Sequence, residues 1–247
     1  MDLLKRMMNL SESESKPVFT FDIPEGPPKL INWADSQALA YLKNMQHGVI
    51  IFIGSGKRGK SATMHSMVQL CWQGRQVYIL DILDIDTKIF PDYKQAKEVD
   101  DIEPGSIVII EDAIRMFGSR GSSANAILQL WLPLVSHKKC VVIITVQSMS
   151  STDIEFLRSQ DCVVIHKQMF NEDISWERSE FLLVQAFVNV QIAKAVKKYP
   201  DIDERAWTFF DRWNELIAMP LVEWWGDQHS YMFMYVKLGD LKGVKLS

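Results

Sequence analysis

From residue 48 onward, runs of apolar residues recur along the chain. Short runs of apolar, often β-branched residues are separated by amphipathic segments, as in a sheet whose strands are buried on both faces. The runs predict five strands, at 48–53, 76–82, 106–112, 140–147 and 162–167. Because these strands alternate with predicted helices, we expect an α/β fold with a mainly parallel sheet flanked by helices.

Helical spacing of apolar residues marks the segments between and around these strands. Asp35 or Ser36 is placed to cap the first helix, and Gly74 to end the second. Pro133 predicts a kink or an early end in another. The predicted helices span 33–45, 60–72, 122–136, 152–159, 178–198 and 203–218. The aromatic-rich segment 223–238 is a candidate for one further strand.

The same pattern divides the chain into three parts. Residues 1–30 read as an N-terminal extension, and the polar run at 11–15 makes residues 1–16 typical of a flexible lead-in. The alternating strands and helices place the core at 31–170. Residues 171–247 are expected to form a small helical C-terminal elaboration packed on that core.

Composition narrows the class of protein. The 247 residues are 47% hydrophobic and carry a net charge of −4, which gives no support to a wholly basic DNA binder but leaves room for a basic loop. Cys71, Cys140 and Cys162 lie in apolar runs without zinc-ligand spacing, so we expect buried thiols in a reducing compartment. Without an apolar leader or a membrane-spanning run, the chain is expected to be cytoplasmic and not an integral membrane protein.

Residues 54–61, GSGKRGKS, fit the phosphate-loop pattern G-x-x-x-x-G-K-[ST] at every fixed position. The loop follows a predicted strand and opens a predicted helix, where backbone N–H groups and the helix dipole favour a phosphate. Lys60 is expected to reach the β- and γ-phosphates, and Ser61 to ligate Mg²⁺. Lys57 lacks a following hydroxyl residue and is left at the loop tip. The predicted cofactors are ATP and Mg²⁺, and the predicted nucleotide contacts are Gly54, Ser55, Gly56, Lys57, Arg58, Gly59, Lys60, Ser61 and Ala62.

Two further features point from nucleotide binding to hydrolysis. Glu111 and Asp112 end the strand at 106–112, the edge of an open α/β sheet where ligands bind. One carboxylate is needed for Mg²⁺ and one for the attacking water; by position we assign Glu111 to the metal and Asp112 to the water, with the roles interchangeable. Gln147 ends the next strand, where an amide can sense the γ-phosphate. Lys60, Glu111, Asp112 and Gln147 are therefore the predicted catalytic residues.

The phosphate loop, the segment IVIIEDA and the segment VVIITVQSMSSTDIEFLRSQDCVVIHK resemble the FtsK–HerA superfamily of DNA-pumping ATPases. Within it, the chain looks like the genome-packaging ATPases of double-stranded DNA viruses with internal membranes. The resemblance covers about residues 45–170. It implies a RecA-like P-loop NTPase core and a ring of five or six subunits with ATP at their interfaces. It also implies sequence-independent contact with double-stranded DNA, capsid or inner-membrane proteins of a virion as partners, and a place in the host cytoplasm or the virion.

The chain departs from this family in two places. The acid pair is Glu–Asp, whereas the usual order is Asp–Glu. Members often carry an arginine just before the sensor strand, facing the ATP of the neighbouring subunit; here that segment is SHKKC. Lys138 could substitute as a point charge, although it lacks the planar fork of arginine. Arg115, Arg120 and Arg158 are the other candidates for action in trans.

Two basic segments are candidates for contact with the phosphate backbone of DNA. Residues 115–125 form a Gly/Ser-rich loop after the acid pair, with Arg115 and Arg120 as its cations. Residues 194–198, KAVKK, are the second candidate. Each also fits an ordinary solvated surface.

The function that these observations favour is an ATP-hydrolysing motor that translocates double-stranded DNA, packaging a viral genome into a preformed capsid. Three alternatives stay open at this point. One is another P-loop ATPase, for phage morphogenesis or DNA partition. The second is a small-molecule kinase, although residues 168–247 show no clear arginine-rich lid. The third is a scaffold that binds nucleotide without turnover.

Overall fold

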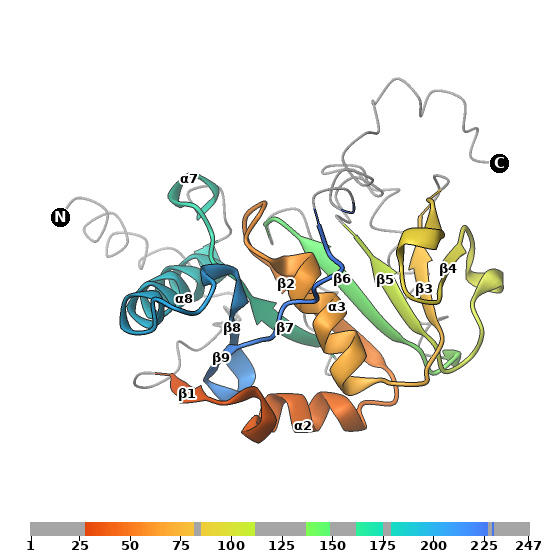
Figure 1. Cartoon of the computed structure of the whole chain (residues 1–247), viewed down its shortest axis with the longest axis horizontal. Helices are drawn as coiled ribbons and strands as arrows, with labels where there is room; N and C mark the ends of the chain where they lie inside the picture. The colour runs from red at the N-terminus through yellow and green to blue at the C-terminus, as the bar shows by residue number, and fades with distance from the viewer. Residues whose placement is uncertain are drawn as a thin grey trace, which may run out of the picture.

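The computed structural model describes residues 28–81, 85–111, 137–148, 162–174, 179–226 and 229. These residues form a nine-stranded sheet with helices on both faces (Figure 1). The strands are β1 (Lys29–Ile31), β2 (Gly48–Ile53), β3 (Val77–Leu80), β4 (Tyr93–Ala96), β5 (Ile107–Ile110), β6 (Val141–Val146), β7 (Cys162–His166), β8 (Trp207–Phe210) and β9 (Glu215–Ala218). The helices are α2 (Gln37–Asn44), α3 (Lys60–Cys71), α7 (Asn171–Ile174) and α8 (Ser179–Lys198). Short 3-10 turns are η1 (Trp33–Asp35), η2 (Thr87–Ile89), η3 (Val99–Asp101), η5 (Glu204–Ala206) and η6 (Asp211–Trp213).

The sheet has the order β1-β9-β8-β7-β2-β6-β5-β3-β4. The five predicted strands are β2, β3, β5, β6 and β7, and they pair in parallel. Strand β6 lies between the strand that precedes the phosphate loop and the strand that precedes Glu111. This order confirms the predicted RecA-like α/β class. It also brings the carboxyl ends of β2, β5 and β6 to one edge of the sheet, where the candidate site lies.

Local signals predicted the elements around this edge well. Strand β2 coincides with the predicted span, and α3 begins at Lys60, the last lysine of the loop. The N-cap of α2 is Ser36, whose side chain accepts a hydrogen bond from the amide of Leu39. A continuous apolar run can be located from sequence because a strand buried on both faces needs apolar side chains on both.

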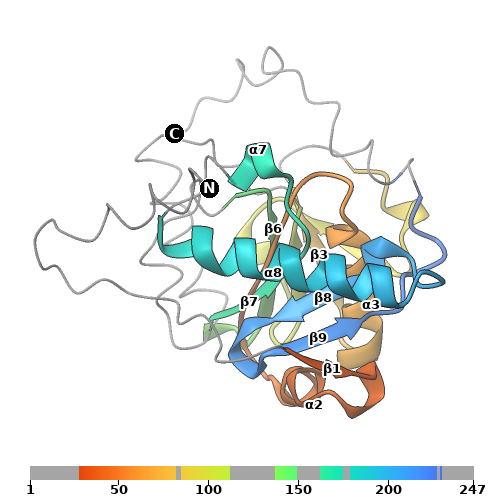
Figure 2. The ribbon, with the colours of Figure 1, turned by 90° about the vertical axis from the view of Figure 1, so that its left-hand side faces the viewer.

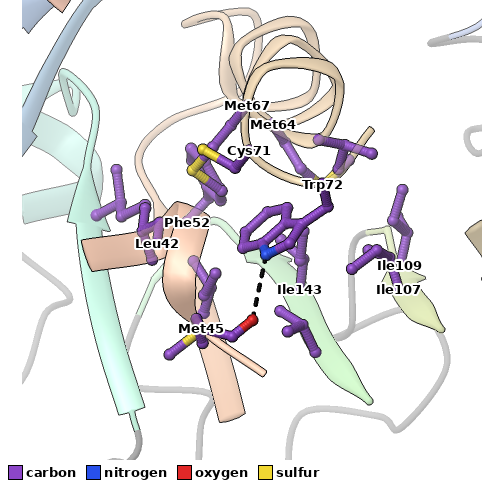
Figure 3. Packing of buried hydrophobic residues seen from close by; sticks show 14 of the residues in the cluster. Leu42, Met45, Phe52, Met64, Met67, Cys71, Trp72, Ile107, Ile109 and Ile143 are labelled. Atoms are coloured by element: carbon purple, nitrogen blue, oxygen red, sulfur yellow. Dashed lines mark hydrogen bonds between the residues drawn. The ribbon is translucent and has the colours of Figure 1, made fainter. Parts of the chain in front are cut away.

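Helices α2 and α3 cover one face of the sheet and enclose the largest core cluster. Trp72, directly after α3, lies among apolar side chains of α2, α3, β2, β5 and β6 (Figure 3). Its indole N–H donates to the carbonyl oxygen of Met45 over 3.4 Å. This packing fixes the helix that begins at the phosphate loop against the strands beneath it.

Helix α8 covers the other face and crosses the sheet over β7 and β8 (Figure 2). Successive side chains of a strand point to opposite faces, and β8 and β9 use both. Phe209 and Leu216 pack with α8, whereas Phe210 and Ile217 belong to the cluster under α2 and α3. These two strands are therefore part of the core.

The helix predicted at 203–218 is wrong. This segment forms η5, β8, η6 and β9, and Asn214 adopts a left-handed conformation with φ of 50° at the turn between the last two. The reason is tertiary: β8 pairs antiparallel with β7 and so extends the core sheet. The predicted helical elaboration at 171–247 thus contains α7 and α8 together with two strands.

The N-terminal part also contributes to the sheet, because β1 pairs in parallel with β9. The predicted lead-in at 1–16, the predicted helices at 122–136 and 152–159, and most of the predicted strand at 223–238 lie outside the described residues. The three part boundaries stay predictions. Across the described ranges, no helix has both the length and the apolar character that crossing a membrane requires.

Candidate nucleotide site

The phosphate loop connects β2 to α3 and is tightly enclosed by other parts of the chain. Gly54 has φ of 152° and Gly59 has φ of 80°, conformations that L side chains rarely adopt. A Cβ on Gly54 would lie 2.8 Å from the Cβ of Lys167, and one on Gly59 would lie 2.5 Å from the carbonyl oxygen of Arg205. Both glycines of the motif are thus required by backbone conformation and by close approach.

The two loop lysines occupy different environments. The ammonium of Lys60 donates to the carbonyl oxygens of Gly54 and Ser55 over 2.7 and 2.9 Å, so it lies across the loop. Lys57 is exposed at the loop tip, with φ of 61°. This geometry agrees with the predicted frame, in which Lys60 is the phosphate lysine.

Two segments from the C-terminal half hold the loop in place. The Ser55 hydroxyl donates to the carboxylate of Asp173 and accepts from the amide of Phe170 over 2.7 Å. On the other side, Arg58 forms an ion pair with Glu204 at 2.7 Å, and its guanidinium lies 4.3 Å from the ring centroid of Phe170. These contacts assign Ser55 and Arg58 to loop support in this structure.

Glu111 is the point where the loop helix, β5 and β6 meet. Its carboxylate is buried, with 4% of the residue exposed. Oxygen Oε2 accepts from the hydroxyls of Ser61 and Thr145 over 3.0 and 2.8 Å. Oxygen Oε1 faces Nε2 of His65 at 3.6 Å and has no hydrogen-bond partner among the described residues. Ser61 and Glu111, fifty positions apart, are thus brought into direct contact.

This arrangement fits Mg²⁺. The hydroxyl of Ser61 donates its proton to Glu111, which leaves its oxygen lone pairs for a cation. Oε1 of Glu111 is buried and faces Nε2 of His65, so the oxygen offered to a cation is that of Ser61, whose proton Glu111 accepts. Among the described residues no group of three His, Cys, Asp or Glu side chains could hold a metal, and a bound nucleotide would add phosphate oxygens to the hydroxyl of Ser61. Mg²⁺ is commonly bound in this way, by one or two protein oxygens plus phosphates.

Gln147 is placed at the same edge of the sheet. Ile53 pairs with Val146 and Ile110 pairs with Ile144, so the residues that follow these strands lie near one another. Gln147 follows β6 directly and is exposed. Its position agrees with the predicted sensor, and the sensing role stays a prediction.

A buried lysine lies directly behind the loop. The ammonium of Lys167 donates to Thr63 Oγ1 over 3.0 Å, to the carbonyl oxygen of Arg205 over 2.6 Å and to Thr208 Oγ1 over 2.9 Å. Lys167 is fully buried, and burial holds its pKa well below the ordinary value. Its side chain therefore ties the loop helix to η5 and β8.

Lys138, the remaining predicted residue that the structure describes, is not brought to the loop. Lys138 precedes β6, at the opposite edge of the sheet, and its ammonium donates to the carbonyl oxygens of Val99 and Ile102 over 2.8 and 3.0 Å. A role in trans stays a prediction for it. Asp112, Arg115, Arg120 and Arg158 lie outside the described residues.

Three residues of the site were not expected from the sequence: His65, Thr145 and Lys167. Two of them carried a signal. Thr145 is the only polar residue within β6, and His65 lies four positions after Ser61, on the same face of α3. Burial lowers the pKa of His65, whose ring is fully enclosed.

No protein-family model and no curated protein sequence matches this chain. Among solved structures, the chain is similar to the DNA-packaging ATPase B204 of Sulfolobus turreted icosahedral virus, with 12% identity and a TM-score of 0.42, over 72% of this chain and 100% of that one. The genome-packaging NTPase B204 of Sulfolobus turreted icosahedral virus 2, in complex with AMPPCP, gives 14% identity and a TM-score of 0.41, over 72% and 98% of the two chains.

The N-terminal domain of zonular occludens toxin from Neisseria meningitidis is a further similar structure. It shares 19% identity and a TM-score of 0.32, over 49% of this chain and 76% of that one. At these identities and TM-scores, the fold assignment rests on the strand order and phosphate loop of this chain itself.

Proposed function

We propose that this chain binds ATP at residues 54–61 and hydrolyses it with Mg²⁺, and that hydrolysis drives translocation of double-stranded DNA. One observation carries the enzymatic part: the hydroxyls of Ser61 and Thr145 converge on one buried oxygen of Glu111. A carboxylate with only a structural role at a helix start would be expected to accept from backbone amides, whereas Glu111 accepts from the hydroxyl that follows the phosphate lysine. Glu111 therefore supports catalysis beside the phosphates.

The roles of the residues follow from their positions. Lys60 would exchange its loop carbonyl acceptors for the β- and γ-phosphate oxygens when ATP binds. Ser61 and Glu111 would hold the metal side of the phosphates, where a bound Mg²⁺ neutralises the charge that develops on them. Asp112 is the proposed base for the attacking water, and Gln147 the proposed sensor of the γ-phosphate. Water would attack the γ-phosphorus in line with the bond to the β,γ-bridging oxygen; that bond would break, ADP would leave, and the proton of the water would pass to Asp112 as inorganic phosphate forms.

The proposed use of this hydrolysis is packaging of double-stranded DNA into a viral capsid by a ring of subunits. This part rests on the sequence resemblance over about residues 45–170. The exposed lysines Lys194, Lys197 and Lys198 at the end of α8 are candidate backbone contacts. Arg115 and Arg120 are proposed as the second set.

The test is ATP hydrolysis with and without double-stranded DNA, for the wild type, Lys60→Ala, Lys57→Ala and Lys43→Ala. Lys60→Ala should lower turnover by about 10²–10³-fold, the loss expected for one positioned donor at a developing charge. Lys57→Ala should lose far less, because its side chain is exposed. Lys43→Ala, at an exposed position of α2, is the control for loss of a surface lysine.

The outcomes separate the alternatives. Unchanged hydrolysis in Lys60→Ala would overturn the site. Hydrolysis that DNA does not stimulate would favour a morphogenesis or partition ATPase over a packaging motor. Transfer of phosphate to a nucleoside or nucleotide would indicate a kinase. Nucleotide binding without turnover would indicate a scaffold.

A further inference from the structure

His65 is a buried polar side chain that faces Oε1 of Glu111. It lies on α3 one turn after Ser61 and is fully buried. Its Nε2 atom is 3.6 Å from Oε1 of Glu111. Neither atom has a hydrogen-bond partner among the described residues. Each therefore completes the hydrogen bonding of the other after a small approach, and such bonds are often long until the substrate is bound.

The far side of the imidazole is fixed by a second polar contact. Nδ1 of His65 lies 3.3 Å from the hydroxyl of Tyr93 on β4. A hydroxyl that donates to Nδ1 leaves the proton of the neutral ring on Nε2, the nitrogen that faces Glu111. The opposite tautomer would aim a lone pair at the carboxylate. A charged imidazolium also carries a proton on Nε2, so the contact to Glu111 is a donor in either state.

Aromatic rings hold the imidazole plane. The ring centroids of Phe90, Trp224 and Trp225 lie 6.0, 5.0 and 4.6 Å from that of His65. The segment that carries the tryptophans is itself anchored, because His229 accepts from the amide of Gly226 over 3.0 Å and lies 3.1 Å from the carbonyl oxygen of Ile89. Residues from three distant parts of the chain thus hold His65 in one orientation.

We propose that His65 is a positioning residue for the ATP hydrolysis proposed above: its Nε2–H holds Oε1 of Glu111, so that Oε2 stays on the hydroxyl of Ser61. His65 is buried and acts through Glu111. Ser61 and His65 lie on the same face of α3. Because Ser61 contacts Oε2 and His65 faces Oε1, both oxygens of the Glu111 carboxylate are held by the helix that begins at the phosphate loop. The carboxylate then keeps one orientation toward the metal side of the phosphates.

The experiment uses two variants of similar size, His65→Gln and His65→Met. Both fill the aromatic cage, but only glutamine carries an amide that can donate to Glu111. We expect His65→Met to lower kcat for ATP by about 10–100-fold, the usual loss for a residue that orients a metal-side ligand. His65→Met should also raise the Mg²⁺ concentration at half-maximal turnover. His65→Gln should recover most of both, and nucleotide affinity in EDTA should stay within about twofold for all three proteins.

Two outcomes overturn the proposal: unchanged kcat and Mg²⁺ dependence in His65→Met, or equal losses in both variants together with lower free energy of unfolding. Tyr93→Phe is a second variant, expected to give a smaller loss of kcat because it removes only the contact to Nδ1. Failure of the proposed function is distinguishable, since the wild type would then hydrolyse no ATP. In that case, nucleotide affinity is measured with and without Mg²⁺ for wild type and His65→Met. An equal gain in affinity on adding Mg²⁺ in the two proteins overturns the role of His65.

Discussion

Two glutamates with similar surroundings differ in the role that we propose for them. Glu215, at the start of β9, is 1% exposed, and Glu111, after β5, is 4% exposed. Each accepts a hydrogen bond from a serine hydroxyl, Ser36 at 2.7 Å and Ser61 at 3.0 Å. Ser36 is the N-cap of α2, and Ser61 lies in the first turn of α3. Burial and a hydroxyl partner therefore do not distinguish a structural acid from a chemical one.

The difference lies in the second oxygen. Oε2 of Glu215 also accepts from the amide of Ala38, and its Oε1 accepts from the amide of Gln37. Both oxygens are satisfied by groups at the start of α2, where carboxylates are favoured by the helix dipole. Glu111 has two hydroxyls on one oxygen and no hydrogen bond from the described residues on the other. A buried carboxylate that accepts from the hydroxyl of the phosphate loop, and not from backbone amides, is placed to act on the metal side of a bound nucleotide.

The largest expected effect is a loss of ATP turnover, and it tests the proposed catalytic role of Glu111. Glu111→Gln keeps an acceptor oxygen for the two hydroxyls but removes the charge. Charge neutralisation on the metal side is worth several kcal/mol in the transition state, so turnover should fall on the order of a thousandfold. The free energy of unfolding should change by less than about 1 kcal/mol. ATPase rates and urea unfolding of the same preparation check both, and a fully active Glu111→Gln would contradict the assignment.

Glu215→Ala should have the opposite pattern: it should lower the stability of the fold and leave ATP turnover unchanged. It leaves the Ser36 hydroxyl and two amides of α2 without their charged acceptor, and such bonds contribute about 1.5–3 kcal/mol. We expect the free energy of unfolding to fall by about 3 kcal/mol, measured by urea denaturation. Turnover per folded molecule should stay at the wild-type level. A selective loss of turnover without a loss of stability would make Glu215 part of the active machinery.

The sequence alone was sufficient to predict where Lys60 and Glu111 lie relative to the strands of the sheet. Fixed spacing selected Lys60 over Lys57, and the apolar run before Glu111 placed that carboxylate at a strand end. Both inferences depend on residues that are close together in the chain. The hydroxyl of Thr145 could not be assigned to Glu111 in the same way, because this contact depends on the pairing of β5 with β6.

The strands at 207–218 show the same limit. The apolar residues of this segment are compatible with helical spacing, and the predicted helix followed from that local pattern alone. What makes Trp207–Phe210 a strand is its antiparallel pairing with β7, whose paired residues Ile165 and His166 lie 45 and 43 positions earlier in the chain. Propensity and periodicity are weak where a distant strand offers backbone hydrogen bonds.

Lys167 is a third buried ionisable side chain, and it can be compared with the two glutamates. It has three hydrogen-bond partners, none of which is a carboxylate. Burial lowers its pKa; Asp203 opposes that shift and Lys60 adds to it. Between the lowered native pKa and the ordinary value of about 10.4, the unfolded chain binds the extra proton. The free energy of unfolding should therefore rise with pH in that window, by at most about 1.4 kcal/mol per pH unit.

Lys167→Met removes this rise. Urea unfolding of wild type and Lys167→Met at several pH values from 7 to 9.5 should give curves that diverge as pH increases. Lys43→Met, at an exposed lysine of α2, controls for the loss of one positive charge. Parallel curves for wild type and Lys167→Met would show that Lys167 keeps the same proton in the folded and unfolded states over this range.

The smallest effect compares the two serines. Ser36→Ala removes the N-cap of α2, whose oxygen accepts from the amide of Leu39 over 3.0 Å, and should lower the free energy of unfolding by about 1 kcal/mol. Glu215 keeps its two amide donors in this variant, so the loss stays smaller than that of Glu215→Ala. Ser61→Ala should instead raise the Mg²⁺ concentration needed for turnover, and its loss of stability should be no larger than that of Ser36→Ala, because Glu111 keeps the hydroxyl of Thr145 and Gly59 caps α3 without a side chain. If the two variants gave the same pattern, the two glutamates would not differ in the way that their second oxygens indicate.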